Sequence, residues 1–160
     1  MDIKSVKIKK PDDVNIIIGQ AHFIKTVEDL YEVFVTAGAG MKFGIAFCEA
    51  SGACKIRVEG NDDAMQKIAT ENAASLAAGH TFVIALTQGF PIQVLNQIKN
   101  IHEVCTIFAA TANALEVIVA DNGQGRGILG VIDGASPKGV EDKSDIEWRK
   151  SLLRKIGYKR

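Results

Sequence analysis

The sequence predicts one domain, residues 1–160, of mixed α+β (α/β) class, in which about four helices pack on a mixed β-sheet. Three observations predict it. The chain has 160 residues, 47% hydrophobic and 24% charged, which is enough for one buried core. After the first strand, helical and extended segments alternate in the order β-α-β-β-α-β-α-β-β-β-α. Some neighbouring strands are separated only by turns, which argues against a purely doubly wound sheet.

Short β-branched and apolar runs between turn residues predict the strands, and apolar residues spaced three or four apart predict the helices. The predicted strands are 3–9, 14–18, 43–48, 54–58, 81–86, 104–110, 116–120 and 127–132. The predicted helices are 27–37, 62–78, 91–101 and 145–156.

Capping residues set the predicted ends of the first two helices. Thr26 is an N-cap residue with Asp29 three positions on, and Gly38 is placed to end that helix. Asn61 is the expected N-cap of the second helix, which Gly79 ends.

The later helices also carry start signals. Pro91 occupies the first position of the third helix. Ser144 and Glu147 form a capping box for the fourth, which then shows an apolar stripe of Trp148, Leu152 and Ile156.

The strand 43–48 has two different faces. One carries bulky side chains and the other small ones, so a helix or a ligand can lie close to the second face. The bulky residues are Phe43, Ile45 and Phe47, and the small ones are Gly44, Ala46 and Cys48.

Composition excludes several classes of protein. Lys and Arg number 19, as do Asp and Glu, so no general attraction to nucleic acid is expected. The apolar runs are too short to span a bilayer, and the N-terminus lacks the apolar segment of a signal peptide. Three cysteines without metal-ligand spacing suit a reducing cytoplasm, where we expect them to pack as small apolar side chains.

The connection between the second strand and the first helix is the strongest candidate site. His22 and Lys25 lie on it, before the positive end of the helix at Thr26. Backbone N–H groups at a helix start bind anions, so a phosphate is the expected ligand and Gln20 is counted with its binding residues. A neutral imidazole at His22 is the expected nucleophile, with Lys25 beside it.

A glycine-rich segment at residues 125–130 matches the pattern G-x-G-x-x-G. A dinucleotide-binding fingerprint requires a helix after the glycines, whereas a strand is predicted here, and the chain is too short for a protein kinase. What remains is a hairpin in which Gly125, Arg126 and Gly127 contact phosphate oxygens. A plain tight hairpin is the alternative.

Polar residues near the ends of the strands at 43–48 and 54–58 form a possible second wall of a nucleotide pocket. Glu49 is suited to hold ribose hydroxyls, and Ser51, Arg57 and Asn61 are counted with the binding residues. Asp62 is the candidate ligand for Mg²⁺. Ordinary capping of the following helix is the alternative for this aspartate.

Six blocks of the chain resemble the adenosine-specific kinase family, which comprises small prokaryotic proteins. The blocks are GQAHFIKTVEDL (19–30), FGIAFCEASG (43–52), RVEGND (57–62), GHTFVIAL (79–86), ATANALEVIVAD (110–121) and QGRGILGVIDG (124–134).

The resemblance implies an α/β fold that assembles as a homo-oligomer, a trimer or a multiple of it. It also implies binding of AMP, ADP or ATP, with Mg²⁺, and a histidine that carries phosphate. Motif match places that histidine at His22, although His80 lies in another matching block. The family name makes adenosine the acceptor and AMP the product.

Two other functions stay open at this point. One is a non-catalytic oligomer that binds AMP or a similar nucleotide as a sensor. The other is a hydrolase or mutase of a small phosphorylated metabolite, which requires an acidic side chain within reach of His22.

Overall fold

The computed structural model describes residues 1–37 and 40–160. Gly38, expected to end the first helix, lies outside the described residues. Within the described part the chain forms eight strands, four α-helices and one short 3₁₀ helix. The strands are β1 (Asp2–Lys7), β2 (Asn15–Ala21), β3 (Lys42–Cys48), β4 (Ile56–Gly60), β5 (Thr81–Thr87), β6 (Val104–Thr111), β7 (Leu115–Asp121) and β8 (Arg126–Asp133). The helices are α1 (Thr26–Ala37), α2 (Asp63–Leu76), η1 (Pro91–Gln93), α3 (Leu95–Lys99) and α4 (Lys143–Lys155).

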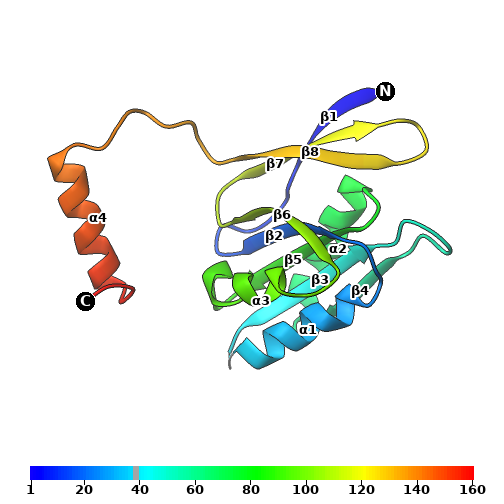
Figure 1. Cartoon of the computed structure of the whole chain (residues 1–160), viewed down its shortest axis with the longest axis horizontal. Coiled ribbons are helices and arrows are strands. Elements are labelled where there is room, and N and C mark those ends of the chain that lie inside the picture. The colour runs from blue at the N-terminus through cyan, green and yellow to red at the C-terminus, as the bar shows by residue number, and fades with distance from the viewer. Residues whose placement is uncertain (38–39) are drawn as a thin grey trace.

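The strands form two sheets, and every ladder in them is antiparallel. A five-stranded sheet has the order β4-β3-β5-β2-β6, and a three-stranded sheet has the order β1-β7-β8 (Figure 1). The α+β class and every predicted strand are therefore confirmed. The strands do not form one mixed sheet, because in the described part of the chain β1, β7 and β8 form ladders only with one another. One isolated parallel bridge joins Arg126 of β8 to Ala78.

Two buried layers lie on opposite faces of the larger sheet. On one face, Ile16, Ala46 and Val83 pack against α2 and against the inner face of the smaller sheet. On the other face, Ile17, Ile45 and Ile84 pack against α1 and α3. Alternate residues of each strand thus enter different layers, as the period of a β-strand requires.

Strand β3 has one bulky and one small face, and a helix lies close to the small face, as the sequence predicted. Phe43, Ile45 and Phe47 enter the layer under α1, and Phe34 of α1 stacks on Phe43 with ring centroids 4.6 Å apart. The small face lies against α2 so closely that a Cβ built on Gly44 would be 2.1 Å from the backbone nitrogen of Gln66. The absence of a side chain at Gly44 therefore sets the distance between α2 and the sheet.

The helix ends differ from the predictions in detail. Asp62, not Asn61, is the N-cap of α2, and Ala77 ends it in the left-handed region with φ 49°. The predicted third helix is broken at Val94, whose φ of −125° is not helical. The capping box of α4 joins Asp142 to Asp145, two residues earlier than expected.

The cysteines behave differently from one another. Cys48 is buried, as expected, and burial raises the pKa of its thiol to about 11. Cys54 and Cys105 are exposed, because the first lies in the turn of the β3–β4 hairpin and the second on the edge strand β6. In the described part of the chain, no helix has the length and apolar character needed to cross a lipid bilayer.

Candidate functional site

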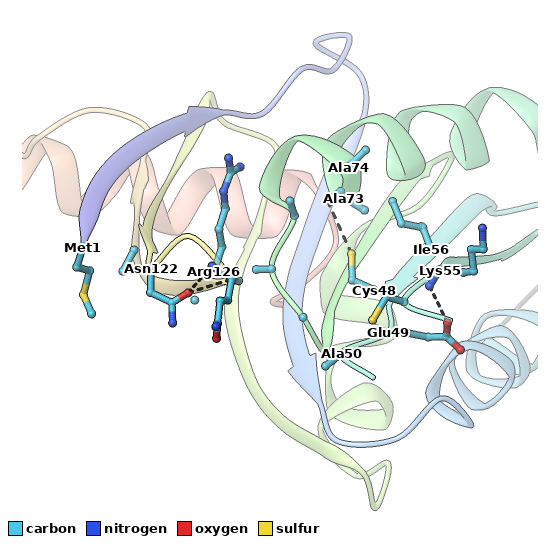
Figure 2. Close-up of a pocket in the computed structure, with 18 residues that line it drawn as sticks. Met1, Cys48, Glu49, Ala50, Lys55, Ile56, Ala73, Ala74, Asn122 and Arg126 are labelled. Carbon is cyan, nitrogen blue, oxygen red and sulfur yellow. Dashed lines mark hydrogen bonds between the residues drawn. The ribbon is translucent and has the colours of Figure 1, made fainter. Parts of the chain in front are cut away.

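Two neighbouring clefts lie beside the end of β3, and Glu49 and Ala50 line both of them. The larger cleft, of about 810 Å³, has β3, β4 and the C-terminal end of α2 on one side and the β7–β8 hairpin on the other (Figure 2). The smaller cleft, of about 270 Å³, is lined by the β2–α1 connection, by β3 and by the residue that precedes β5. Glu49 and Ala50 therefore form a wall that is common to the two clefts.

Two histidines from distant parts of the chain line the smaller cleft. His22 follows β2, and its backbone N–H donates a hydrogen bond to the carbonyl oxygen of Glu103 at 3.0 Å. His80 precedes β5. Its backbone N–H donates to the carbonyl of Cys48 at 2.7 Å, and its own carbonyl accepts from the N–H of Ala21 at 3.0 Å. Adjacent strands therefore hold the backbone of His80 on both sides.

The His80 side chain is more firmly placed than that of His22. Its ring stacks on Phe47 with centroids 6.0 Å apart and planes 22° apart. It is half-buried, whereas His22 is exposed. The backbone of His80 has φ 62°, a conformation that residues other than glycine seldom adopt and that is frequent at active sites.

Glu49 stands between the two clefts and is ionised at neutral pH. One carboxylate oxygen accepts from the backbone N–H of Lys55 at 2.7 Å, and the other accepts from the Arg57 guanidinium at 2.8 Å. These two hydrogen bonds lower the pKa of Glu49. Arg57 offsets the charge of Glu49, and Ser51 lines the smaller cleft beside the histidines.

The larger cleft has an apolar wall that the sequence analysis missed. The last turn of α2 and the residues after it present four alanines to the cleft, and Ile56 of β4 lies beside them. Small side chains at this helix end leave room for a flat group. The run of alanines just before Gly79 was the signal in the sequence. The four alanines are Ala73, Ala74, Ala77 and Ala78.

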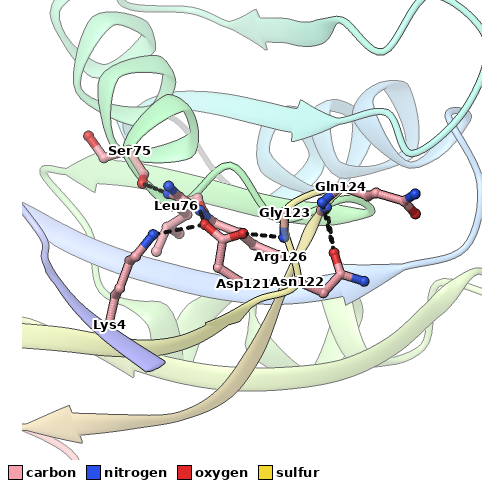
Figure 3. Close-up of polar contacts among 9 residues, drawn as sticks. Lys4, Ser75, Leu76, Asp121, Asn122, Gly123, Gln124 and Arg126 are labelled. Atoms are coloured by element: carbon pink, nitrogen blue, oxygen red, sulfur yellow. Dashed lines mark hydrogen bonds and ion pairs between the residues drawn. The ribbon is translucent and has the colours of Figure 1, made fainter. Parts of the chain in front are cut away.

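The opposite wall is the glycine-rich hairpin, whose anchor is Asp121 (Figure 3). This carboxylate accepts from the backbone N–H of Gly123 at 2.9 Å, from the Lys4 ammonium at 3.0 Å and from the Arg126 guanidinium at 3.0 Å. Arg126 also donates to the carbonyl of Ser75 near the C-terminal end of α2, at 3.2 Å. The network ties the smaller sheet to α2 and so holds the two walls of the cleft together.

We expect Asp121 to make the free energy of unfolding depend on pH in the acid range. The Gly123 N–H, then Lys4 and Arg126, hold the pKa of this carboxyl far below its ordinary value of about 3.9. The folded state therefore gains from the ionised form at all pH values above about 4, and that gain falls as the pH drops below it. The Asp121→Asn variant should lose stability at pH 7, and the difference in free energy of unfolding between the two proteins should narrow steadily as the pH falls below about 4. Urea unfolding at several pH values measures this, and a constant difference across the range would contradict it.

Comparison with known proteins identifies the family. The sequence profile described as "Adenosine specific kinase" matches residues 6–159. The chain belongs to the adenosine-specific kinase family. It is also similar to the crystal structure of the PH1918 protein from Pyrococcus horikoshii OT3, with 42% sequence identity and a TM-score of 0.95. The match covers 99% of this chain and 98% of that one. No curated protein matches the chain.

In this member of the adenosine-specific kinase family, the start of α1 differs from the expected anion site. The N–H groups of Thr26 and Val27 already donate to the carbonyls of Phe23 and Ile24, at 3.1 and 3.2 Å. The buried Thr26 hydroxyl donates to Phe23 as well, at 2.6 Å. These donors are used within the turn and are not free to bind a phosphate.

Lys25 is drawn away from the histidines. Its ammonium pairs with Asp29 and lies 3.9 Å from the buried carboxylate of Glu103, on the wall of a third cleft that His102 also lines. Burial, and then the neighbouring Asp29 carboxylate, raise the pKa of Glu103. The structure therefore brings His22, Glu49 and Ser51 together with His80, and it places Lys25 elsewhere.

The remaining predicted binding residues have other partners. Gln20 is exposed on β2, where it pairs with Thr81 and Thr106 across the sheet. The Asn61 side chain accepts from the N–H of Phe43 at 2.8 Å and holds the start of β3. Gly125, Arg126 and Gly127 line the larger cleft, and Arg126 is also part of the Asp121 network.

Asp62 does not fit a bound metal ion. Its carboxylate accepts from the N–H of Met65 at 3.1 Å as the cap of α2, and it lies 3.4 Å from the Lys42 ammonium. Among residues 1–37 and 40–160, no group of three or more His, Cys, Asp or Glu side chains could hold a metal. The capping role, the alternative that the sequence offered, accounts for Asp62.

Proposed function

We propose that this protein is a phosphotransferase that binds adenosine nucleotides and transfers a phosphoryl group through a phosphohistidine. One observation carries the proposal: two imidazoles share a small pocket that opens beside a cleft of nucleotide size. Membership of the adenosine-specific kinase family supports the choice of adenosine as the nucleoside.

The larger cleft suits the nucleoside. Its volume of about 810 Å³ is within the range of small-molecule sites. The alanine wall at the end of α2 offers an apolar surface to a purine ring, and the glycine-rich hairpin lets the ligand approach its backbone closely. Glu49, at the junction of the two clefts, is placed to accept hydrogen bonds from ribose hydroxyls. The phosphates would then extend into the smaller cleft.

We assign the attack on phosphorus to His80. A ring nitrogen of its neutral imidazole attacks the terminal phosphorus of ATP, an N–P bond forms, the bridging P–O bond breaks, and ADP leaves. In the second step the 5′-hydroxyl of adenosine attacks the phosphohistidine. The N–P bond breaks, a P–O bond forms, and the hydroxyl proton passes to the freed ring nitrogen, which yields AMP.

The assignment to His80 follows from how firmly its ring is held. A nucleophile that is already positioned loses less entropy on reaching the reacting geometry. His80 has hydrogen bonds on both sides of its backbone and stacks on Phe47, while the exposed His22 has a single backbone anchor. We therefore give His22, which the sequence favoured as the nucleophile, the role of donating a ring N–H to the phosphoryl oxygens.

The hydrolase or mutase alternative is less well supported. It requires an acidic side chain near the histidines that can donate a proton. Glu49 lines the same cleft, but the bonds from Lys55 and Arg57 lower its pKa. An ionised carboxylate does not serve as a general acid at neutral pH.

Incubation with ATP labelled on its terminal phosphate tests the proposal, with and without adenosine. We expect label on the protein in a form that is lost in acid and stable in base, and label in AMP when adenosine is present. Binding of the nucleotide without transfer to protein or adenosine would support a nucleotide sensor instead, and would overturn the phosphotransferase. Assembly as a trimer, or a multiple of it, stays a prediction from the resemblance.

A further inference from the structure

Glu103 is a buried ionisable residue that the proposed reaction does not use. It lies just before β6 and exposes 3% of its surface. Among residues 1–37 and 40–160, its Oε1 is the only buried side-chain oxygen or nitrogen atom that has no hydrogen-bond partner. An atom of this kind is rare in a folded protein, because an unpaired buried polar group costs free energy. An ionised carboxylate would be costlier still, since part of its charge would lie on an oxygen without a donor.

The neighbouring cation indicates which form the Glu103 carboxyl takes. The Lys25 ammonium pairs with Asp29 and lies 3.9 Å from Oε1 of Glu103, beyond hydrogen-bond distance. If Glu103 were ionised, its buried charge would attract the ammonium more strongly than the more exposed Asp29 does. Lys25 nevertheless pairs with Asp29, whose side chain is 22% exposed against 4% for Glu103. This geometry fits an ionised Asp29 beside a neutral, protonated Glu103.

Asp29 and Glu103, which we call the carboxyl pair, are neighbours because one ammonium lies against both of them. Burial, and then the hydrogen bond with Asp29, raise the pKa of Glu103. Burial opposes the ionisation of Asp29, but the hydrogen bonds from Lys25 and Glu103 outweigh it and lower the pKa of Asp29. Two carboxyl groups form a hydrogen bond only when one of them carries a proton, so the pair shares one proton.

The other charged groups around the carboxyl pair support this arrangement. His102, next to Glu103 in the chain, favours the ionised form of Asp29. Glu32 of α1 favours the charged form of Lys25. On the side of β6, the Cys105 thiol donates to the backbone carbonyl of Glu103 at 3.6 Å. These groups hold the charges on Asp29 and Lys25 and leave the proton on Glu103.

The backbone of Glu103 anchors His22. Ala21 at the end of β2 pairs with Val104 at the start of β6, and one residue further the N–H of His22 donates to the carbonyl of Glu103 at 3.0 Å. Lys25 lies three residues after His22 on the same β2–α1 connection. Glu103 therefore meets this connection twice, through its carbonyl at one end and its carboxyl at the other. It is not among the described residues that line the smaller cleft, so it can act there only through the connection.

We propose that Glu103 is a positioning residue for His22 and that it acts in its protonated form. The shared proton keeps the start of α1 against the residue that anchors His22. When this proton passes to solvent, two ionised carboxylates face each other beside a single ammonium, and their repulsion displaces the connection. Because the pKa of Glu103 is raised, the anchor is complete below that pKa and weakens as the pH rises through it. The effect on phosphoryl transfer rests on the proposed function, whereas the movement of His22 does not.

Nuclear magnetic resonance of the full-length chain, labelled with ¹³C and ¹⁵N, tests the proposal without nucleotide. The carboxyl carbon of Glu103 should titrate above about 4.3, the ordinary value for glutamate. The backbone amide of His22 should shift with the same midpoint, in addition to any step that its own ring causes. Glu103→Gln, whose amide donates to Asp29 as the protonated acid does, should abolish this step. Glu32→Gln is the matched control, since it removes an exposed carboxylate of the third cleft, and it should retain the step.

Two further measurements use the same midpoint. Asp29→Asn removes the neighbouring negative charge and frees Lys25, so the titration of Glu103 should move to lower pH. In the unmodified chain, phosphate transfer from ATP should fall about 10²-fold as the pH rises through the midpoint, because a small misplacement of a group at the reacting phosphate has that effect. Affinity for AMP should stay within several-fold over the same range. Glu103→Gln should remove the fall in transfer.

The outcomes separate this proposal from the phosphotransferase reaction. A Glu103 carboxyl that titrates at or below about 4.3, or a His22 amide that does not follow it, would overturn the positioning role. If ATP leaves no phosphate on the protein while the His22 amide still follows Glu103, the reaction is overturned and the positioning role is supported. If phosphate forms at a rate that shows no step at the midpoint, the positioning role is overturned and the reaction stands.

Discussion

Replacement of His80 by asparagine should abolish phosphate on the protein while leaving nucleotide affinity within several-fold of the original. The side chain that forms the N–P bond is lost, so transfer to adenosine should fall by about 10³-fold or more. Asparagine is close to histidine in size and polarity. The strained backbone of His80, with φ 62°, also suits asparagine better than most residues. The variant should therefore fold, and the loss should report on chemistry.

The His22→Asn variant should retain the phosphohistidine but form it more slowly. Removal of one hydrogen-bond donor to the phosphoryl oxygens costs about 10²–10³ in turnover. His102→Asn is the matched control, since this third histidine lines a different cleft with Lys25, and it should behave as the unmodified protein.

Intact-mass measurement after incubation with ATP follows all three histidine variants, and calorimetric titration with AMP checks that each binds. Loss of phosphate in His22→Asn and its retention in His80→Asn would reverse the assignment of roles and restore the one that the sequence favoured. Retention of phosphate in both would overturn the phosphohistidine mechanism at this pocket.

Replacement of Gly44 by alanine should be the most destabilising single-methyl change in the fold. The new Cβ would lie 2.1 Å from the backbone nitrogen of Gln66 and 2.2 Å from the backbone carbonyl carbon of Met65. Backbone in a helix cannot move aside as a side chain can, so α2 must shift away from the sheet. We expect a loss of more than about 3 kcal/mol, at or above the upper end for overpacked sites.

A glycine in open surroundings is the control for this substitution. Gly130 of β8 has no heavy atom within 4 Å of a built Cβ, so Gly130→Ala should change the free energy of unfolding by less than about 1 kcal/mol. Urea unfolding compares the two variants. An equal loss of stability in the two variants would show that the close contact with α2 does not determine the effect of a methyl group at Gly44.

The elements could be predicted from the sequence because their signals are local. Alternating or continuous apolar runs marked all eight strands, and caps and periodicity marked the helices to within a few residues. The unlike faces of β3 even indicated which side a helix approaches. The pairing could not be predicted in the same way, since the separation of β1, β7 and β8 into a second sheet depends on contacts between residues more than 100 positions apart.

The candidate site likewise has a part that could be predicted from local sequence and a part that could not. His22, Glu49, Ser51 and the glycine-rich hairpin could be named from residue types and turns. Their grouping with His80 could not, because His80 reaches the pocket through a pairing of its backbone with the strands β2 and β3. The phosphate-binding roles expected of Lys25 and of the start of α1 required hydrogen-bond donors that are free. In the folded chain the Lys25 ammonium pairs with Asp29, and the first N–H groups of α1 donate to carbonyls of the preceding turn.

By itself, then, the sequence determined the segments, their amphipathic faces and the chemistry of the residues between them, all of which depend on neighbours within one or two turns of the chain. Tertiary structure alone decided which histidines meet, which charges neutralise one another and which apolar faces stay uncovered. The physical reason is that hydrogen bonds, ion pairs and burial depend on distance in space, and closing the long loops between these residues is governed by the whole fold rather than by any one segment.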